Sequence, residues 1–87
     1  MLSNWLFDTI IMENLAAEQF LILFGKQLRK LRKERKLSYR DLAQRCNVDY
    51  SDISKIEKGQ IRIQLPTLYE LSLGLDVHPK TLFDFTL

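Results

Sequence analysis

Between Asn14 and Arg35 the apolar residues recur at intervals of three or four positions, the spacing of one face of an α-helix. The members of this stripe are Ala17, Phe20 or Leu21, Phe24, Leu28 and Leu31. The pattern predicts one amphipathic helix that tolerates Gly25 as a weak point. Before it, the residues from Ser3 to about Met12 are expected to form a separate short helix, capped by Ser3 or Asn4.

The middle of the chain carries start and stop signals for two further helices. Ser38 and Asp41 have the spacing of a capping box, which predicts a helix from Ser38 with Leu42, Ala43 and Cys46 on its inner face. Asp49 can cap the next helix, which turns Ile53 and Ile56 inward. Gly59 suits the left-handed residue that ends a helix.

Two more helices are expected near the C-terminus, each with a proline in its first turn. One runs over about 65–75 with Pro66, and the other begins after His78 with Pro79 and contains Leu82, Phe83 and Phe85. No segment favours a strand, and 87 residues suffice for one domain. We therefore predict an all-α fold.

The positive charge is concentrated in the middle of the chain. The net charge is only +2, but residues 24–62 contain twelve basic and five acidic residues. Residues 1–23 contain three acids and no base, and residues 63–87 contain one base and three acids. This asymmetry is expected of a surface that meets nucleic-acid phosphates, and a solvated helix face is the alternative interpretation.

Two motifs agree in order and spacing with a known family. The first is LSYRDLAQRCNVDYSDISKIEKG at residues 37–59, and the second places leucines at 65, 68, 71, 75 and 82 with Val77 and Phe83. From about Phe24 to Phe85 the chain resembles the Cro/repressor-type (XRE-like) helix-turn-helix family. The resemblance implies a five-helix DNA-binding domain over 24–87. The apolar residues before it predict an N-terminal helical extension over 1–23.

The resemblance also implies a function and its site. The chain is expected to be a sequence-specific transcriptional regulator whose recognition helix, about 49–58, lies in the major groove of double-stranded DNA. The expected base-contacting residues are Tyr50, Ser51, Asp52 and Lys55. The expected phosphate-contacting residues are Tyr39, Arg40, Lys58 and Arg62. For Asp52 two roles stay open, acceptance from cytosine N4 or repulsion of wrong sites.

Four residues are expected to support the recognition helix. Arg32 and Glu57 match a pair that, in the family, joins the first helix to the end of the third. Ala43 is small where the two helices of the motif approach closely, and Val48 inserts into the corner between them. A planar guanidinium such as that of Arg32 suits a semi-buried bridge.

One domain of this size offers few base contacts, so we expect a homodimer on a two-fold-symmetric operator. The interface is assigned in part to the N-terminal extension and in part to the fifth helix. The expected residues are Trp5, Phe7, Ile10, Ile22, Leu23, Phe83 and Phe85. The alternative is that residues 1–13 fold back over helices four and five of the same chain.

Other functional classes fit less well. His78, the only histidine, is expected at a helix cap, and no catalytic, cofactor or metal spacing is present, so no enzyme is expected. Cys46 is interpreted as a small buried apolar residue of a cytoplasmic protein. No apolar run is long enough to span a membrane. The rival function is a protein–protein module, an antitoxin or adaptor that binds its partner through the N-terminal extension.

Overall fold

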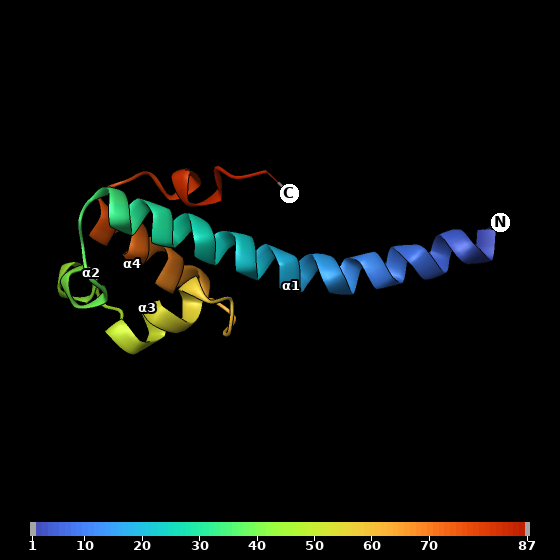
Figure 1. The fold of residues 1–87 in the computed structure, drawn as a ribbon, viewed down its shortest axis with the longest axis horizontal. Helices are drawn as coiled ribbons and strands as arrows, with labels where there is room; N and C mark the ends of the chain where they lie inside the picture. Colours follow the sequence, from blue (N-terminus) through green and yellow to red (C-terminus); the bar gives the residue numbers. More distant parts are fainter. Residues whose placement is uncertain (1, 87) are drawn as a thin grey trace.

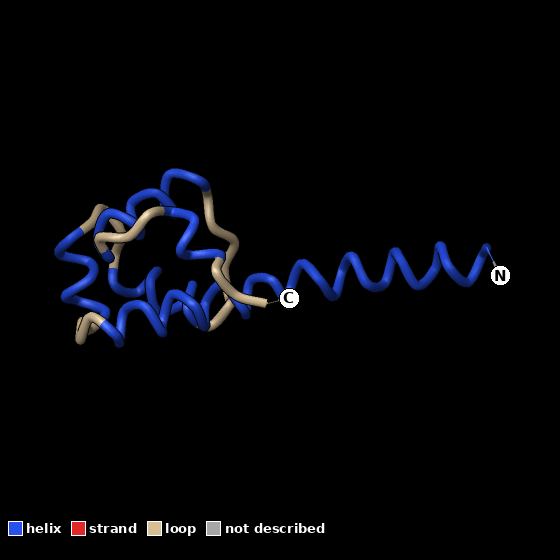
Figure 2. The backbone as a smooth tube through the Cα atoms, turned by 90° about the horizontal axis from the view of Figure 1, so that it is seen from above, coloured by secondary structure: helices blue, strands red, loops and turns tan. Residues whose placement is uncertain are grey.

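The computed structural model describes the backbone of residues 2–86 and the side chains of residues 17–86. Four α-helices follow one another: α1 (Leu2–Glu34), α2 (Tyr39–Arg45), α3 (Tyr50–Glu57) and α4 (Leu65–Leu75). A 3-10 helix, η1 (Pro79–Phe83), comes last. Residues 2–86 contain no strand, as predicted (Figures 1 and 2).

The first helix differs from the expectation. One helix of 33 residues replaces the two that were predicted to meet near Met12. Residues 12–15 contain neither glycine nor proline, and extending an existing helix costs less free energy than nucleating a second one. The N-terminal half of α1 therefore extends away from the other elements (Figure 1), and the molecule measures 53 × 21 × 20 Å.

The prediction of a fifth α-helix was also wrong, because the segment after His78 forms only the five-residue 3-10 helix η1. The His78 imidazole accepts a hydrogen bond from the backbone N–H of Lys80 at 3.1 Å, as expected of a cap. Thr81 N–H donates to the His78 carbonyl, which is the i→i+3 bond of a 3-10 helix. The backbone leaves helical geometry at Asp84, so the segment is too short for α-helical bonds to accumulate.

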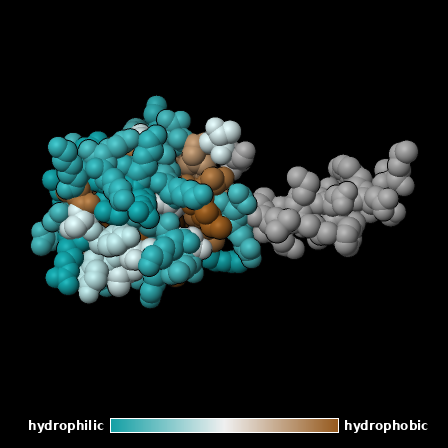
Figure 3. All heavy atoms as spheres, viewed as in Figure 1, coloured by the Kyte–Doolittle hydropathy of each residue, from teal (hydrophilic) through white to brown (hydrophobic). Residues whose placement is uncertain are grey.

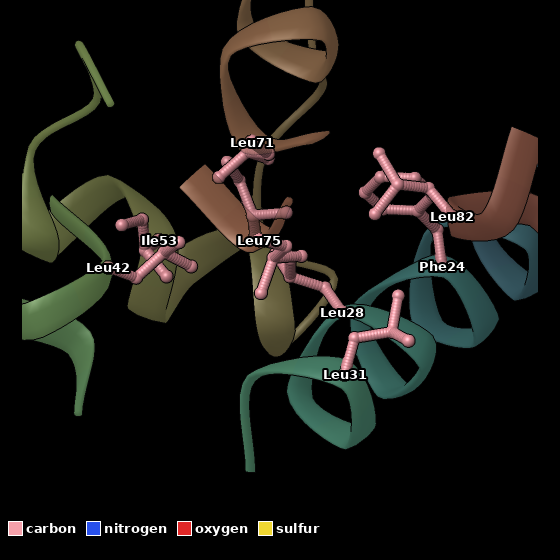
Figure 4. Packing of buried hydrophobic residues seen from close by; sticks show 9 residues of the cluster. Phe24, Leu28, Leu31, Leu42, Ile53, Leu71, Leu75 and Leu82 are labelled. Atoms are coloured by element: carbon pink, nitrogen blue, oxygen red, sulfur yellow. The ribbon is translucent and has the colours of Figure 1, made fainter. Parts of the chain in front are cut away.

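The core lies where the C-terminal half of α1 meets the other four elements (Figure 4). Its buried members are Phe24, Leu28 and Leu31 of α1, Leu42 of α2, Ile53 and Ile56 of α3, Leu71 and Leu75 of α4, and Leu82 of η1. The predicted inner face of α1 is therefore buried from Phe24 onward, whereas Ala17 and Phe20 are exposed. The predicted inner faces of α2 and α3 are buried or half-buried. Cys46 is half-buried against this core, and burial raises the pKa of its thiol.

Local capping explains where most helices begin and end. Ser38 and Asp41 form the predicted capping box, with bonds of 3.0 and 2.9 Å, and Pro66 lies in the first turn of α4. Gly59 has a φ of 70°, the left-handed geometry expected for it. Asp49 occupies the N-cap position of α3, but its side chain makes no capping hydrogen bond, so that part of the prediction was wrong.

Candidate nucleic-acid interface

The recognition helix predicted at 49–58 corresponds to α3, which follows α2 after the turn Cys46–Asp49. Ala43 and Val48 are half-buried and pack against the core, one on α2 and one in the turn. The backbone N–H of Asn47 donates to the Glu70 carboxylate of α4 at 2.8 Å. The turn is therefore held by packing against the core and by a hydrogen bond to α4.

Gly25 lets α1 and α3 approach closely. A Cβ at this position would lie 2.4 Å from the Glu57 carbonyl oxygen and 2.5 Å from that of Ile56. A side chain there would force one of the two helices to shift, because both obstacles are backbone atoms at the end of α3. The glycine interpreted as a weak point in a helix is thus the place where α3 rests on α1.

The end of α3 is also held by the predicted pair of Arg32 and Glu57. The guanidinium donates to both carboxylate oxygens, at 2.6 and 3.0 Å, and the two side chains are only 8% and 2% exposed. The third nitrogen donates to the Leu37 carbonyl at 2.8 Å. Hydrogen bonding to Glu57 raises the pKa of Arg32 despite burial. A buried bidentate pair of this kind fixes direction as well as distance.

Tyr39 contributes to this joint. The Arg32 guanidinium carbon lies 4.2 Å from the centroid of the Tyr39 ring, and the ring is half-buried against the core. A stacked guanidinium adds a cation–π contact. The ring of Tyr39 therefore packs within the domain, and its role at phosphate stays a prediction that only its hydroxyl could fulfil.

The outward face of α3 presents polar and basic side chains. Tyr50 is 50% exposed, and Ser51 and Lys55 are exposed beside it. Four of the predicted DNA-contacting residues are exposed and positively charged: Arg40, Lys55, Lys58 and Arg62. The Arg40 guanidinium lies 5.1 Å from the centroid of the Tyr50 ring, so the start of α2 and the start of α3 meet at this surface.

Two carboxylates lie at the start of α3, Asp49 at its N-cap and Asp52 in its first turn. Asp49 and the half-buried Asp52 line the same hollow as Arg62 of the loop between α3 and α4. This position lies toward the flank of α3, and the role of Asp52 on DNA stays open.

The predicted dimer residues fall into two groups. The side chains of Trp5, Phe7 and Ile10 lie outside the described residues. Phe83 and Phe85 pack within the chain, where both rings contact Phe20 with centroids 6.1 and 5.6 Å apart. Phe83 also contacts Phe24 at 5.4 Å. These contacts attach η1 to α1 and leave Ile22 and Phe83 each 41% exposed, with Leu23 half-buried.

Sequence reasoning missed three features of the domain. Gln27 is buried and donates to the Thr81 carbonyl at 2.9 Å, which ties α1 to η1; its position within the apolar stripe was the available signal. Glu70 accepts from the turn, and nothing local indicates that. Third, α4 exposes an apolar stripe at intervals of four: Leu65 at 82%, Tyr69 at 56% and Leu73 at 52%. We call these three residues the α4 stripe.

Two kinds of feature are absent from the described part of the chain. Within it, no helix has the length and hydrophobicity needed to cross a membrane. In the same residues, acidic, histidine and cysteine side chains do not gather in threes as a metal site requires.

Comparison with known proteins places the same segment in a family. The sequence model of the HTH_3 family, described as Helix-turn-helix, matches residues 28–82. Control protein C.BamHI of Bacillus amyloliquefaciens is 36% identical over 66 residues, 75% of this chain and 82% of the relative.

Two solved structures share the fold. The restriction-modification controller protein C.AhdI from Aeromonas hydrophila has a TM-score of 0.71 at 36% identity, and the match covers 72% of this chain and 96% of C.AhdI. The controller protein C.Esp1396I was solved as a tetramer in complex with its natural 35 base-pair operator. It has a TM-score of 0.69 at 28% identity, over 75% of this chain and 86% of that one.

Proposed function

This chain belongs to the HTH_3 helix-turn-helix family, and we propose that it is a transcriptional regulator that binds operator DNA sequence-specifically through α3. The observation that carries the proposal is the surface of α3. Its inner face is locked to α1 by the bidentate contact of Arg32 with Glu57, while its outer face presents exposed polar and basic side chains. A rigidly held helix with such an outer face fits a major groove about 12 Å wide.

Within this surface the residues have two roles. Lys55 donates to guanine O6 or N7, Ser51 contacts a neighbouring base, and Tyr50 packs against a thymine methyl. The lysine and arginine side chains around α3 contact phosphates and set the register of the protein on the duplex. The guanidinium of Arg40, which contacts phosphate, lies over the ring of Tyr50, which contacts a base, so the two kinds of contact are made side by side.

The regulator binds as a dimer, because three or four base contacts are too few to select one site in a genome. The α4 stripe supports this state. Three large apolar side chains stand exposed on one face of α4, beside a shallow apolar hollow lined by Pro66, Leu68 and Pro79. Exposed apolar patches on small proteins usually mark interfaces. A second copy offers the same stripe and the same hollow about a two-fold axis.

The test of DNA recognition is in vitro site selection followed by titration at several salt concentrations. Wild-type protein should return a two-fold-symmetric consensus with half-sites about 10 base pairs apart. Lys55→Ala should lose about 1–3 kcal/mol at one base pair and relax the consensus there. Arg62→Ala should weaken all sequences alike and lower the salt slope by about one.

Lys80→Ala is the matched control for these variants, since it removes one exposed positive charge from η1 rather than from the α3 surface. It should keep both the consensus and most of the affinity. Selection that returns an unchanged consensus for Lys55→Ala would remove that residue from base reading. Binding without any sequence preference in the wild-type protein would refute the proposed function itself.

The dimer is tested with Leu73→Lys, which places a charge in the α4 stripe where the side chain is already half exposed. The substitution should leave the fold intact and weaken association in sedimentation equilibrium. Lys80→Ala again serves as the control. If Leu73→Lys associates as the wild-type protein does, the interface lies elsewhere.

A further inference from the structure

The first part of α1, residues 2–16, forms an extension that the domain does not need; we call it the N-terminal arm. The family match begins at residue 28, and C.AhdI is covered to 96% by 72% of this chain. The buried core likewise begins at Phe24. The arm continues α1 beyond the other elements (Figures 1 and 2).

The sequence of the arm is apolar in more than one direction. Nine of its 15 residues are apolar. Leu2, Leu6 and Ile10 follow one another at intervals of four, and so do Phe7, Ile11 and Leu15. In a helix these two series belong to different faces. A helix that is hydrophobic on several faces is typically buried, so the arm requires a partner surface.

The base of the arm supplies a described apolar surface that is continuous with it. Phe20 contacts Phe83 and Phe85, yet it remains 38% exposed. Ile22 and Phe83 are exposed nearby at 41% each. Figure 3 shows hydrophobic atoms on the surface at the end of the domain from which the arm extends. Attaching η1 to α1 therefore does not cover this patch.

Charge narrows the choice of partner. The arm contains Asp8 and Glu13 and no base, and the first base of the chain is Lys26. Nucleic acid and anionic membrane surfaces attract basic segments and repel acidic ones. The partner is therefore a protein surface.

The area available fits a helix of the same kind. Burying Trp5 and Phe7, at roughly 150–250 Å² each, with half of the remaining apolar side chains gives on the order of 700 Å² per copy. Stable interfaces bury about 800 Å² per partner. The patch of Phe20, Ile22 and Phe83 at the base adds to that area.

We infer that the N-terminal arm packs against the arm of a second copy of this chain. The inference rests on the proposed function, which already requires copies to associate on DNA. It gives the chain two self-association surfaces, the α4 stripe that forms pairs and the arm that joins pairs. Two pairs joined in this way bind neighbouring operator sites cooperatively.

The experiment uses the full chain with two double variants. Leu6→Glu with Ile10→Glu adds two charges to one apolar series of the arm. Asn4→Glu with Thr9→Glu adds the same charges to the same arm at polar positions and is the matched control. Circular dichroism verifies that each variant is folded. Sedimentation velocity over a range of micromolar concentrations, and titration of DNA with one or two adjacent sites, are then compared with the wild-type protein.

The wild-type protein and the control should assemble beyond dimers and bind two adjacent sites cooperatively. The Leu6→Glu/Ile10→Glu variant should stop at dimers and lose that cooperativity, while its affinity for a single site changes less than twofold. A variant that sediments as the wild-type protein does overturns the inference and leaves the proposed function intact.

The α4 variant Leu73→Lys separates the two surfaces. If it remains dimeric while the Leu6→Glu/Ile10→Glu variant becomes monomeric, the arm is upheld as an interface and the α4 stripe is not. A wild-type protein that fails to select any DNA sequence overturns the proposed function, whereas its sedimentation still decides the role of the arm.

Discussion

Replacing Gly25 by alanine tests whether the contact between α1 and α3 is as close as the structure indicates. The new Cβ would lie 2.4 Å from the Glu57 carbonyl oxygen, whereas carbon and carbonyl oxygen are normally at least about 3.3 Å apart. One of the helices must therefore move by about 0.9 Å. Both obstructing oxygens belong to the backbone, so no side-chain rotation relieves the clash.

Two opposing effects decide the sign. Alanine in a helix interior is about 1 kcal/mol more favourable than glycine, and overpacking a tight interior typically costs about 1–3 kcal/mol. Because the clash is with backbone, we expect a cost near the upper end and a net loss of about 2 kcal/mol. For a domain of this size that lowers the midpoint of thermal unfolding by about 8–16 °C.

Thermal and urea unfolding measure the change, with Gly74→Ala for comparison. At Gly74 the nearest atom to a new Cβ is the Cδ1 end of the Leu42 side chain, at 2.8 Å. That side chain can rotate, so the cost should be smaller than at Gly25. Operator affinity should fall for Gly25→Ala because α3 shifts. An increase in the melting temperature of Gly25→Ala, as for an unhindered helix position, would refute the close contact.

Two further predictions concern charged groups. Arg32→Lys keeps the charge but loses the bidentate contact with Glu57 and the bond to Leu37. The variant should be less stable by about 1–3 kcal/mol in urea titration and should bind the operator more weakly. An unchanged urea midpoint would contradict this prediction. Hydrogen bonds from Ser38 hold the pKa of Asp41 below 3.8, the ordinary value for an aspartate. The capping box therefore contributes stability above that pH and loses it as pH falls through the lower folded pKa. Unfolding midpoints of Asp41→Asn measured from pH 7 to pH 2 should therefore converge on those of the wild-type protein in acid, and a constant difference over that range would count against the role of the carboxylate.

The features that the sequence predicted well depend on neighbours within a few positions. The capping box at Ser38, the left-handed Gly59 and the cap at His78 are local hydrogen-bonding or steric requirements, so each can be recognised from a few adjacent residues. The buried stripe of α1 follows from helical periodicity alone. These features locate the helices along the sequence, but they do not determine how the helices pack against one another.

The failures have different causes. Asp49 stands at the N-cap position of α3 without a capping hydrogen bond from its side chain. The merging of two expected helices into α1 reflects the cost of nucleation, which no single residue reveals. Gly25 and Glu70 acquire their roles only when α3 and the turn approach them from distant parts of the chain.

The continuity of α1 connects the two ends of the proposed mechanism. Its C-terminal half holds α3 at two contacts, the packing at Gly25 and the bidentate bonds of Arg32 with Glu57. Its N-terminal half is the arm, and no joint separates the two halves. An arm that pairs with another copy therefore fixes the direction of α1, and through it the direction of α3. Because a continuous helix curves gently and kinks sharply only at an identifiable interruption, the spacing between recognition helices in an assembly depends on the arm as well as on the α4 stripe.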